Sequence, residues 1–352
     1  MPSPEPVRPT GETLRQTLAA LPKIDLHRHL EGSLRLSTVV ELARKSHLRV
    51  PTLATAQLRP LVQVTPQDAY TFRNFLSKFE TLRTLYQSPE IIQRVAREVV
   101  LDAANDNVRY LELRFTPRAL AKARDFPLAD VTAWVIAATR AAAQETGIML
   151  RLILSMNRNE SVEIGAAVMR LAVEQKSNGV VGLDLAGDEV NYPAEPFVGL
   201  FREAHQSGLK ITAHAGEWTS APTVRHAIEN LRAERIGHGV RVGEDPVVVA
   251  LARERGVVFE VCPTSNYQSG VVSRLDRHPL PRMLADGLRV TLNTDDPGIS
   301  DITLSDECRV AMPELKLSLA DLKQMTLTAA AAAFLGPAER AALEADFRAR
   351  LA

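Results

Sequence analysis

Two histidines that are two residues apart, His27 and His29, are the first side chains whose type and spacing indicate chemistry. They end an apolar run, and in a β-strand the side chains of residues i and i+2 point to the same side. His214 and Asp295 follow other apolar runs. Three imidazoles and one carboxylate that converge from strand ends would hold one metal ion per chain, with zinc as the best candidate. Iron, cobalt and manganese remain open as alternatives.

Hydrolysis is the chemistry that the neighbouring polar residues predict. A bound zinc ion lowers the pKa of its water toward about 7 and so supplies hydroxide at neutral pH. Glu217, three residues after His214, would lie close to the metal and serve as the general acid and base. His238 could hold or deprotonate the attacking water, and Asp296 could accept a hydrogen bond from substrate or water. The sequence therefore predicts a metal-assisted hydrolase.

Short apolar and β-branched runs bounded by turn residues predict the strands that must position these side chains. There are eight such runs, at residues 24–30, 108–115, 149–156, 180–186, 210–213, 235–237, 257–261 and 289–292. Stretches with helical spacing lie between them, at 89–104, 129–145, 162–176 and 222–233. This alternation predicts an α/β fold, a parallel (β/α)8 TIM barrel, in which the active site forms at the C-terminal ends of the strands.

Residues 33 to 98 form an insertion after the first strand that is larger than one crossover helix requires. Within it, residues 70–85 place Phe72, Phe75, Phe79 and Leu82 on one helical face, which by pattern alone indicates core packing. Residues 329–333 and 337–350 predict closing helices. We therefore expect one barrel domain over residues 21–352, preceded by an extension over residues 1–20 that need not be ordered.

The composition excludes several classes of partner. The 352 residues are 45% hydrophobic and carry 42 basic and 42 acidic side chains, so no bulk positive charge is available to hold nucleic acid or a membrane surface. No run of about 18 apolar residues or signal peptide is evident. Two cysteines, Cys262 and Cys308, suit a reducing cytoplasm. A small molecule is the expected partner, and the oligomeric state stays open.

Six motifs, in order along the chain, resemble those of the adenosine deaminase family in the amidohydrolase superfamily. They are HRHLEG at 27–32, LAGDE at 185–189, HAGE at 214–217, GHG at 237–239, CPTSN at 262–266 and NTDDP at 293–297. The resemblance runs from about residue 21 to about residue 335. It implies a zinc barrel that adds water to C6 of an adenine ring, releases ammonia and leaves the 6-oxo purine.

The resemblance also implies a role for each matching residue. The zinc ligands would be His27, His29, His214 and Asp295. Glu217 would donate a proton to purine N1, and His238 would orient the zinc hydroxide. Asp296 would contact purine N7, and the backbone N–H of Gly187 would contact N3. Further substrate-binding residues would be His29, Glu31, Phe75 and Phe79, the two phenylalanines lying on a helix that closes over the nucleoside.

Two features bear on the substrate in opposite directions. Glu31 stands where adenosine deaminases commonly place an aspartate facing the ribose, and a glutamate there looks more like the adenine deaminase branch. The run at 186–189 and the phenylalanine helix instead resemble the adenosine branch. We therefore expect deamination of adenosine and 2'-deoxyadenosine. The alternatives are adenine, an aminodeoxyfutalosine-type or other 5'-modified adenosine, and an N6-substituted adenine nucleotide.

Three other classes of function fit the sequence less well. A binuclear amidohydrolase commonly needs a modified lysine at the fourth strand, which here ends in Leu-Ala-Gly at 185–187. A catalytically inactive binding protein on the same fold would not need the residues that hydrolysis requires, and all of them are present in this chain. Zinc deaminases that act on nucleic-acid bases carry an HxE motif together with a PCxxC motif, and this chain has no PCxxC.

Overall fold

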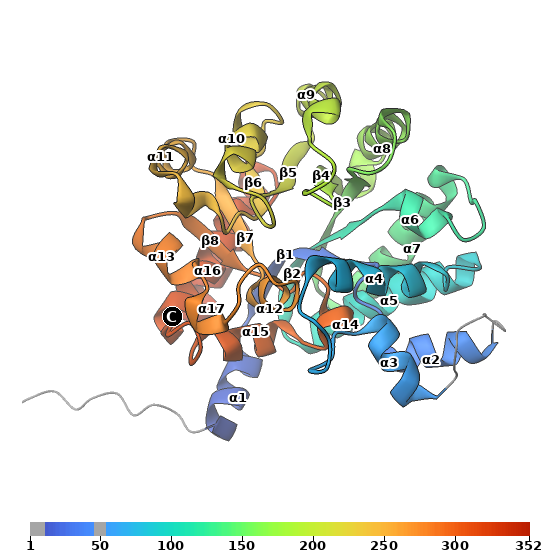
Figure 1. Cartoon of the computed structure of the whole chain (residues 1–352), viewed down its shortest axis with the longest axis horizontal. Helices are drawn as coiled ribbons and strands as arrows, with labels where there is room; N and C mark the ends of the chain where they lie inside the picture. Colours follow the sequence, from blue (N-terminus) through green and yellow to red (C-terminus); the bar gives the residue numbers. More distant parts are fainter. Residues whose placement is uncertain (1–10, 46–53) are drawn as a thin grey trace, which may run out of the picture.

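The computed structural model describes residues 11–45 and 54–352. Eight parallel strands follow one another around a nearly closed barrel in the order β1 to β8 (Figure 1). They are β1 (Lys23–His29), β2 (Val108–Phe115), β3 (Met149–Asn157), β4 (Val180–Ala186), β5 (Lys210–Ala215), β6 (Arg235–His238), β7 (Val258–Val261) and β8 (Arg289–Leu292). The predicted (β/α)8 barrel is confirmed, and the strand ends agree with the predicted ones to within two residues.

Backbone bonds beyond β8 close the barrel against β1. The N–H of His29 donates to the carbonyl of Asp295 at 2.8 Å, and the N–H of Asp295 donates to the carbonyl of His27 at 2.8 Å. Because both bonds join the carboxyl end of β1 to the segment after β8, closure itself brings three predicted metal ligands together.

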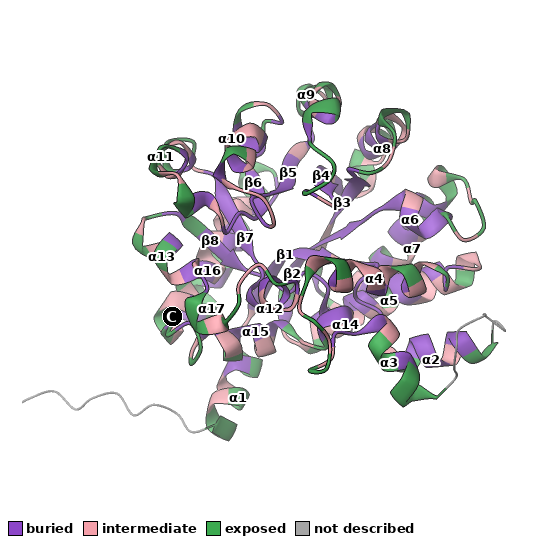
Figure 2. Cartoon of the chain, viewed as in Figure 1, coloured by how far each residue is buried: buried purple, intermediate pink, exposed green. Residues whose placement is uncertain are grey.

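Helices surround the sheet and turn their apolar faces toward it, whereas their outer faces are exposed (Figure 2). They are α1 (Gly11–Ala20), α2 (Leu36–Lys45), α3 (Thr55–Val62), α4 (Phe72–Arg83), α5 (Pro89–Asn105), α6 (Pro117–Ala121), α7 (Leu128–Thr146), α8 (Val162–Glu174), α9 (Val198–Gln206), α10 (Ala221–Glu229), α11 (Pro246–Glu254), α12 (Pro263–Gln268), α13 (Leu280–Ala285), α14 (Pro297–Ser300), α15 (Leu304–Ala311), α16 (Leu319–Ala332) and α17 (Pro337–Leu351). The helix expected at 222–233 ends at Glu229, and it cannot extend to residue 233 because Arg232 has a left-handed backbone, with φ of 63°.

The large insertion after β1 contains α2 to α5, apart from residues 46–53, which lie outside the described residues. Thr71 begins α4 by accepting a hydrogen bond from the N–H of Asn74, as an N-cap does. Phe75 and Leu82 on this helix are buried. Phe72 and Phe79 are only half-buried, so the core stripe predicted for the segment is present at two of its four positions.

The described part of the N-terminal extension is the helix α1, whereas residues 1–10 lie outside the described residues. Leu18 of α1 is buried in the core, and Lys23 donates hydrogen bonds to the carbonyls of Leu18, Ala19 and Leu21. A lysine that satisfies the last carbonyls of a helix favours its end. Lys23 thereby joins α1 to the start of β1.

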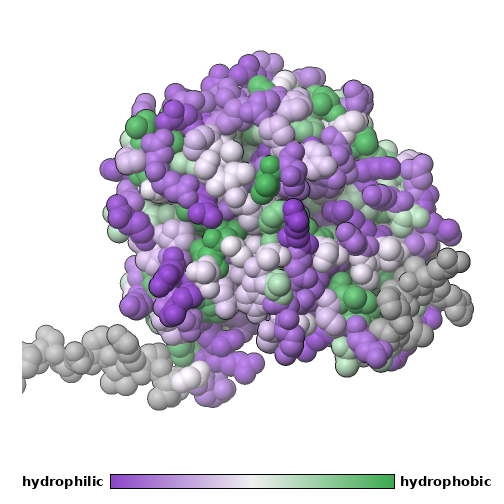
Figure 3. Space-filling view, viewed as in Figure 1, coloured by the Kyte–Doolittle hydropathy of each residue, from purple (hydrophilic) through white to green (hydrophobic). Residues whose placement is uncertain are grey.

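No described helix is long and apolar enough to cross a membrane. The face of the molecule seen in Figure 3 is largely hydrophilic, with hydrophobic residues scattered over it.

Candidate active site

The four predicted metal ligands meet at the carboxyl ends of the strands. One ligand atom from each of His27, His29, His214 and Asp295 lies within 4.8 Å of the others. Nε2 of His27 and Nε2 of His29 lie 3.3 and 3.4 Å from Oδ1 of Asp295. Nε2 of His27 is buried and has no hydrogen-bond partner among the described residues. A buried lone pair without a donor, in a set of three imidazoles and one carboxylate, fits a borderline cation such as zinc.

Carboxylates from neighbouring strands orient two of these imidazoles. Nδ1 of His27 lies 2.8 Å from Oε2 of Glu260, and Nδ1 of His214 lies 3.1 Å from Oδ1 of Asp184. An ionised carboxylate only accepts hydrogen bonds, so each Nδ1 must carry the proton and each Nε2 is left with its lone pair. Both rings therefore present the nitrogen that a metal ion requires.

A buried arginine neutralises this pair of carboxylates. Arg114, which is fully buried, lies 2.7 Å from Glu260 and 3.4 Å from Asp184. Arg235 lies 2.6 Å from the other oxygen of Glu260. Buried charges are tolerated when they are paired, and each arginine of this network lies within 3.4 Å of a carboxylate.

Two residues of the site have a backbone conformation that costs free energy. Asp295 has φ of 61° and His238 has φ of 60°, both in the left-handed region. For residues other than glycine this costs on the order of 1–3 kcal/mol, and such strain is concentrated at functional sites. Ser265 donates a hydrogen bond of 2.6 Å to Oδ2 of Asp295 and so helps to hold the strained aspartate.

Glu217 lies in the turn that follows β5, and another carboxylate shapes that turn. Glu189 accepts hydrogen bonds from the backbone N–H groups of Gly216, Glu217 and Trp218 at 2.6, 3.1 and 3.1 Å. Burial, and secondly the charge of Asp295, raise the pKa of Glu217 well above its ordinary value. The raised pKa favours the protonated form of Glu217, which is able to donate its proton.

A chain of hydrogen bonds fixes the ring of His238. The N–H of Leu280 donates to Nδ1 of His278 at 3.1 Å, so the proton of His278 is on Nε2. Nε2 of His278 lies 3.2 Å from Oδ1 of Asn266 and donates to it. The amide nitrogen of Asn266 must then donate to Nδ1 of His238, at 3.0 Å. Burial lowers the pKa of His238 well below its ordinary value, so the ring is neutral. The proton of His238 is thereby on Nε2, which lies 3.6 Å from Oε1 of Glu217.

Asp296 is packed against a glycine that cannot be replaced without disturbing it. A Cβ atom on Gly32 would lie 1.8 Å from Oδ1 of Asp296. That oxygen is buried and has no hydrogen-bond partner among the described residues. Burial, and secondly the neighbouring Asp295, raise the pKa of Asp296 well above its ordinary value. The raised pKa favours the protonated form of Asp296, which is able to donate a hydrogen bond into the site.

The remaining predicted residues line one small cavity above the cluster. Its volume is about 70 Å³. The predicted residues on its wall are His29, Glu31, Phe75, Phe79, Gly187, His214, Glu217, His238, Asp295 and Asp296, and His27 lies behind them. One oxygen of Glu31 accepts a hydrogen bond from the N–H of Thr116, and the other is buried without a partner among the described residues. The structure thus brings every predicted site residue to one place.

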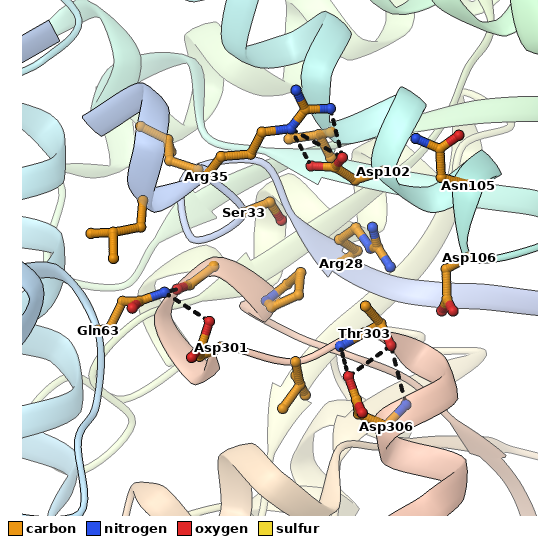
Figure 4. A pocket seen from close by; sticks show the side chains of 16 residues that line it. Arg28, Ser33, Arg35, Gln63, Asp102, Asn105, Asp106, Asp301, Thr303 and Asp306 are labelled. Carbon is orange, nitrogen blue, oxygen red and sulfur yellow. Dashed lines mark hydrogen bonds and ion pairs between the residues drawn. The ribbon is translucent and has the colours of Figure 1, made fainter. Parts of the chain in front are cut away.

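A larger cavity, of about 500 Å³, lies elsewhere and holds none of the predicted metal ligands (Figure 4). Arg28, between His27 and His29 in sequence, lies on its wall because alternate residues of a strand face opposite sides. The Nε atom of Arg28 donates to Asp25 at 3.0 Å and to Thr294 at 3.2 Å. This side chain therefore supports the junction of β1 with the segment after β8.

Sequence reasoning missed the residues that orient the site. Asp184 and Glu260 lie inside β4 and β7, and Ser265 and Asn266 lie in α12 within a recognised motif to which no role was given. The available signal was a carboxylate within a run otherwise expected to be fully buried, because such a charge needs a partner inside the barrel.

The fold and the site together define an amidohydrolase-type barrel, since eight parallel strands carry a His/Asp cluster at their carboxyl ends. The chain belongs to the adenosine deaminase family, whose sequence model matches residues 22–348. The predicted resemblance is confirmed, and the protein is a hydrolytic deaminase by membership of this family.

The chain is similar to known proteins over nearly its whole length. It is 38% identical to an adenosine deaminase of Erwinia tasmaniensis over 94% of this chain and 98% of that protein. An amidohydrolase from Burkholderia ambifaria with bound zinc matches its fold with a TM-score of 0.87 and 29% identity, over 98% of this chain and 94% of that chain. An adenine deaminase from Arthrobacter aurescens matches with a TM-score of 0.85 and 28% identity, over 94% of this chain and 99% of that chain. An Arabidopsis N6-mAMP deaminase matches with a TM-score of 0.84 and 28% identity, over 95% of this chain and 99% of that chain.

Proposed function

We propose that this protein catalyses the zinc-dependent hydrolytic deamination of adenosine and 2'-deoxyadenosine to inosine and 2'-deoxyinosine, with release of ammonia. One observation carries the proposal. Glu217 and Asp296, two carboxyl groups whose pKa values burial raises well above the ordinary range, line the same cavity as the His/Asp cluster. An adenine ring resists attack by water unless a nucleophile and a proton donor act on it together.

His27, His29, His214 and Asp295 would hold the zinc ion. When bound there, zinc supplies a hydroxide nucleophile at neutral pH and stabilises charge that develops on oxygen. The donor set supports one ion, and the zinc-bound relative from Burkholderia ambifaria supports the choice of metal.

Glu217 would donate its proton to purine N1, which makes C6 electrophilic enough for hydroxide to add. The resulting carboxylate would then take the proton of the new C6 hydroxyl and pass it to the amino group, which leaves as ammonia. The 6-oxo purine keeps its N1 proton. The next water molecule that is deprotonated restores the acid form of Glu217, so that adenosine and water give inosine and ammonia.

Three further residues would orient the reactants. His238, with its proton on Nε2, is a hydrogen-bond donor on the side that faces Glu217, which supports its holding the nucleophile rather than deprotonating it. Asp296 would donate to purine N7, because N7 only accepts hydrogen bonds and the raised pKa of Asp296 favours its protonated form. The backbone N–H of Gly187 would contact N3.

The cavity must enlarge to admit a nucleoside. Its volume of about 70 Å³ is well below the roughly 300–1,000 Å³ of ordinary ligand pockets. Phe75 and Phe79 of α4 form part of its wall. We infer that α4 moves outward when substrate enters and that these rings then close over the ribose and purine.

Adenosine is favoured over the alternatives by the similar adenosine deaminases and by the position of Glu31. The hydrogen bond from Thr116 holds the longer Glu31 side chain against the end of β2, and its second oxygen remains free to accept from a ribose hydroxyl. Adenine and N6-substituted adenine nucleotides are the second choice, because two similar structures are deaminases of those compounds.

A substrate panel tests the proposal. Zinc-loaded protein of measured metal content is incubated with adenosine, 2'-deoxyadenosine, adenine, N6-methyl-AMP and a 5'-modified adenosine, and the products are separated by chromatography. We expect adenosine and 2'-deoxyadenosine to be deaminated, each with a higher kcat/KM than adenine. Turnover of another compound with adenosine untouched would refute the choice of substrate.

A further inference from the structure

Arg83, at the last turn of α4, is a charged side chain that faces the active-site cavity without a partner. It lines the same cavity as Glu217 and Gly187. Among the described residues it forms neither an ion pair nor a hydrogen bond, and its Nε is buried. The guanidinium carbon of Arg83 lies 5.5 Å from the centre of the Phe79 ring.

The charge of Arg83 acts on residues other than the proton donor Glu217. Burial raises the pKa values of Glu31, Tyr86 and Glu160, and the charge of Arg83 opposes each rise. The charges that act on Glu217 are those of Asp295, Glu189 and Arg158 instead. In the proposed binding mode Glu31 meets the ribose, so Arg83 belongs to the sugar side of the substrate.

The nearby carboxylates do not satisfy this arginine. Neither Glu31 nor Glu160 forms an ion pair with it, and Glu31 is already held by the N–H of Thr116. Arg83 is half-buried, and its buried Nε has no acceptor among the described residues. The planar set of donors of a guanidinium matches a carboxylate or a phosphate. The hydroxyl groups of an unmodified ribose supply no such charge.

We propose that Arg83 binds an oxyanion, a carboxylate or a phosphate, carried on the sugar side of an adenine nucleoside, so that the protein prefers an anionic nucleoside over unmodified adenosine. The inference rests on the proposed function and refines its substrate class. Because Arg83 is on α4, the anion would also hold this helix in its closed position over the purine.

Binding of product analogues tests the proposal without turnover. The affinities of inosine, inosine 5'-phosphate and inosine 5'-carboxylic acid for zinc-loaded protein are measured by calorimetry. We expect at least one anion to bind on the order of 10- to 100-fold more tightly than inosine, as a hydrogen bond to a charged group does. The two anions distinguish a phosphate from a carboxylate as the group recognised.

Arg83→Met should abolish most of this preference. Arg73→Met is the matched control, because it removes the same charge from the same helix. Arg73 is exposed and does not line the cavity. Arg83→Gln, which keeps a polar side chain, replaces the methionine variant if that variant does not fold. Equal affinities for inosine and both anions, or a preference that Arg83→Met leaves intact, would overturn the proposal.

Kinetics separates this inference from the proposed function. In Arg83→Met, kcat/KM for an adenosine 5'-carboxylate or 5'-phosphate should fall more steeply than kcat/KM for adenosine. If both fall equally, Arg83 has only a structural role and the deaminase assignment stands. If the wild type deaminates no adenine compound, the proposed function is wrong, whereas the calorimetry still decides what Arg83 binds.

Discussion

Asp184 lies 3.1 Å from His214, through Oδ1 and Nδ1, and both side chains are almost completely buried at the carboxyl ends of neighbouring strands. The carboxylate fixes which nitrogen of His214 keeps its proton and leaves the other free for a metal ion. The affinity of the site for metal thus depends on residues that do not touch the metal.

Asp184→Asn is predicted to weaken zinc binding by about 10- to 100-fold, because the amide no longer imposes the correct form of His214. Competition with a chromogenic chelator measures the affinity. Asp130→Asn, at an exposed position in the first turn of α7, is the control. If Asp184→Asn bound zinc as tightly as the control, the orienting role of Asp184 would be wrong.

Glu217→Gln should retain zinc and lose activity by about 10² to 10⁴-fold, the usual contribution of a general acid and base. The amide has nearly the same shape but cannot transfer the proton that N1 needs. Metal content and kcat are measured on the same preparation, with the exposed Glu229→Gln of α10 as the control. Unchanged turnover in Glu217→Gln would refute the assigned role.

Asn266→Asp should move the proton of His238 from Nε2 to Nδ1. A carboxylate accepts where the amide donated, so Nδ1 of His238 would take the proton and Nε2 would lose it. We expect kcat to fall about 10- to 100-fold, as for other residues that orient a ligand or catalytic group. Zinc content should not change. A variant with normal kcat would show that the form of His238 is unimportant.

The stability of the fold should depend on pH through Glu307 of α15, which is fully buried. Burial raises its pKa from 4.5 to about 8. Between these values the folded state holds a proton that the unfolded state has lost, so the free energy of unfolding falls as pH rises. One titrating group contributes a slope of about 1.4 kcal/mol per pH unit.

Glu307→Gln should remove that slope, so that the variant gains stability relative to the wild type as pH rises from 5 to 8. Urea unfolding at several pH values measures the difference. Parallel curves for the two proteins across this range would contradict the protonated state of Glu307.

Much of the barrel and its site could be predicted from sequence, because the strands are nearly continuous apolar runs and the polar residues of the site directly follow them. His27 and His29 could be placed on one side of a strand from their spacing alone. His214, Glu217 and Asp295 could be grouped because the carboxyl ends of parallel strands meet at one face of a barrel.

The supporting interactions could not be predicted, because they depend on which strands are neighbours and at what register. Glu260 reaches His27 across the barrel, 233 residues away in sequence. The small volume of the cavity and the unpaired state of Arg83 arise from how α4 packs on the strand ends. Such packing leaves no mark in the periodicity of a single chain.

Release of ammonia from adenosine, measured on one preparation before chelation, after chelation and after addition of one equivalent of zinc, tests the central claim most directly. We predict ammonia and inosine in equal amounts, loss of both when the metal is removed, and recovery when zinc is restored. Failure of the zinc-loaded protein to release ammonia from adenosine or any other adenine nucleoside, or release that persists after the metal is removed, would contradict the account.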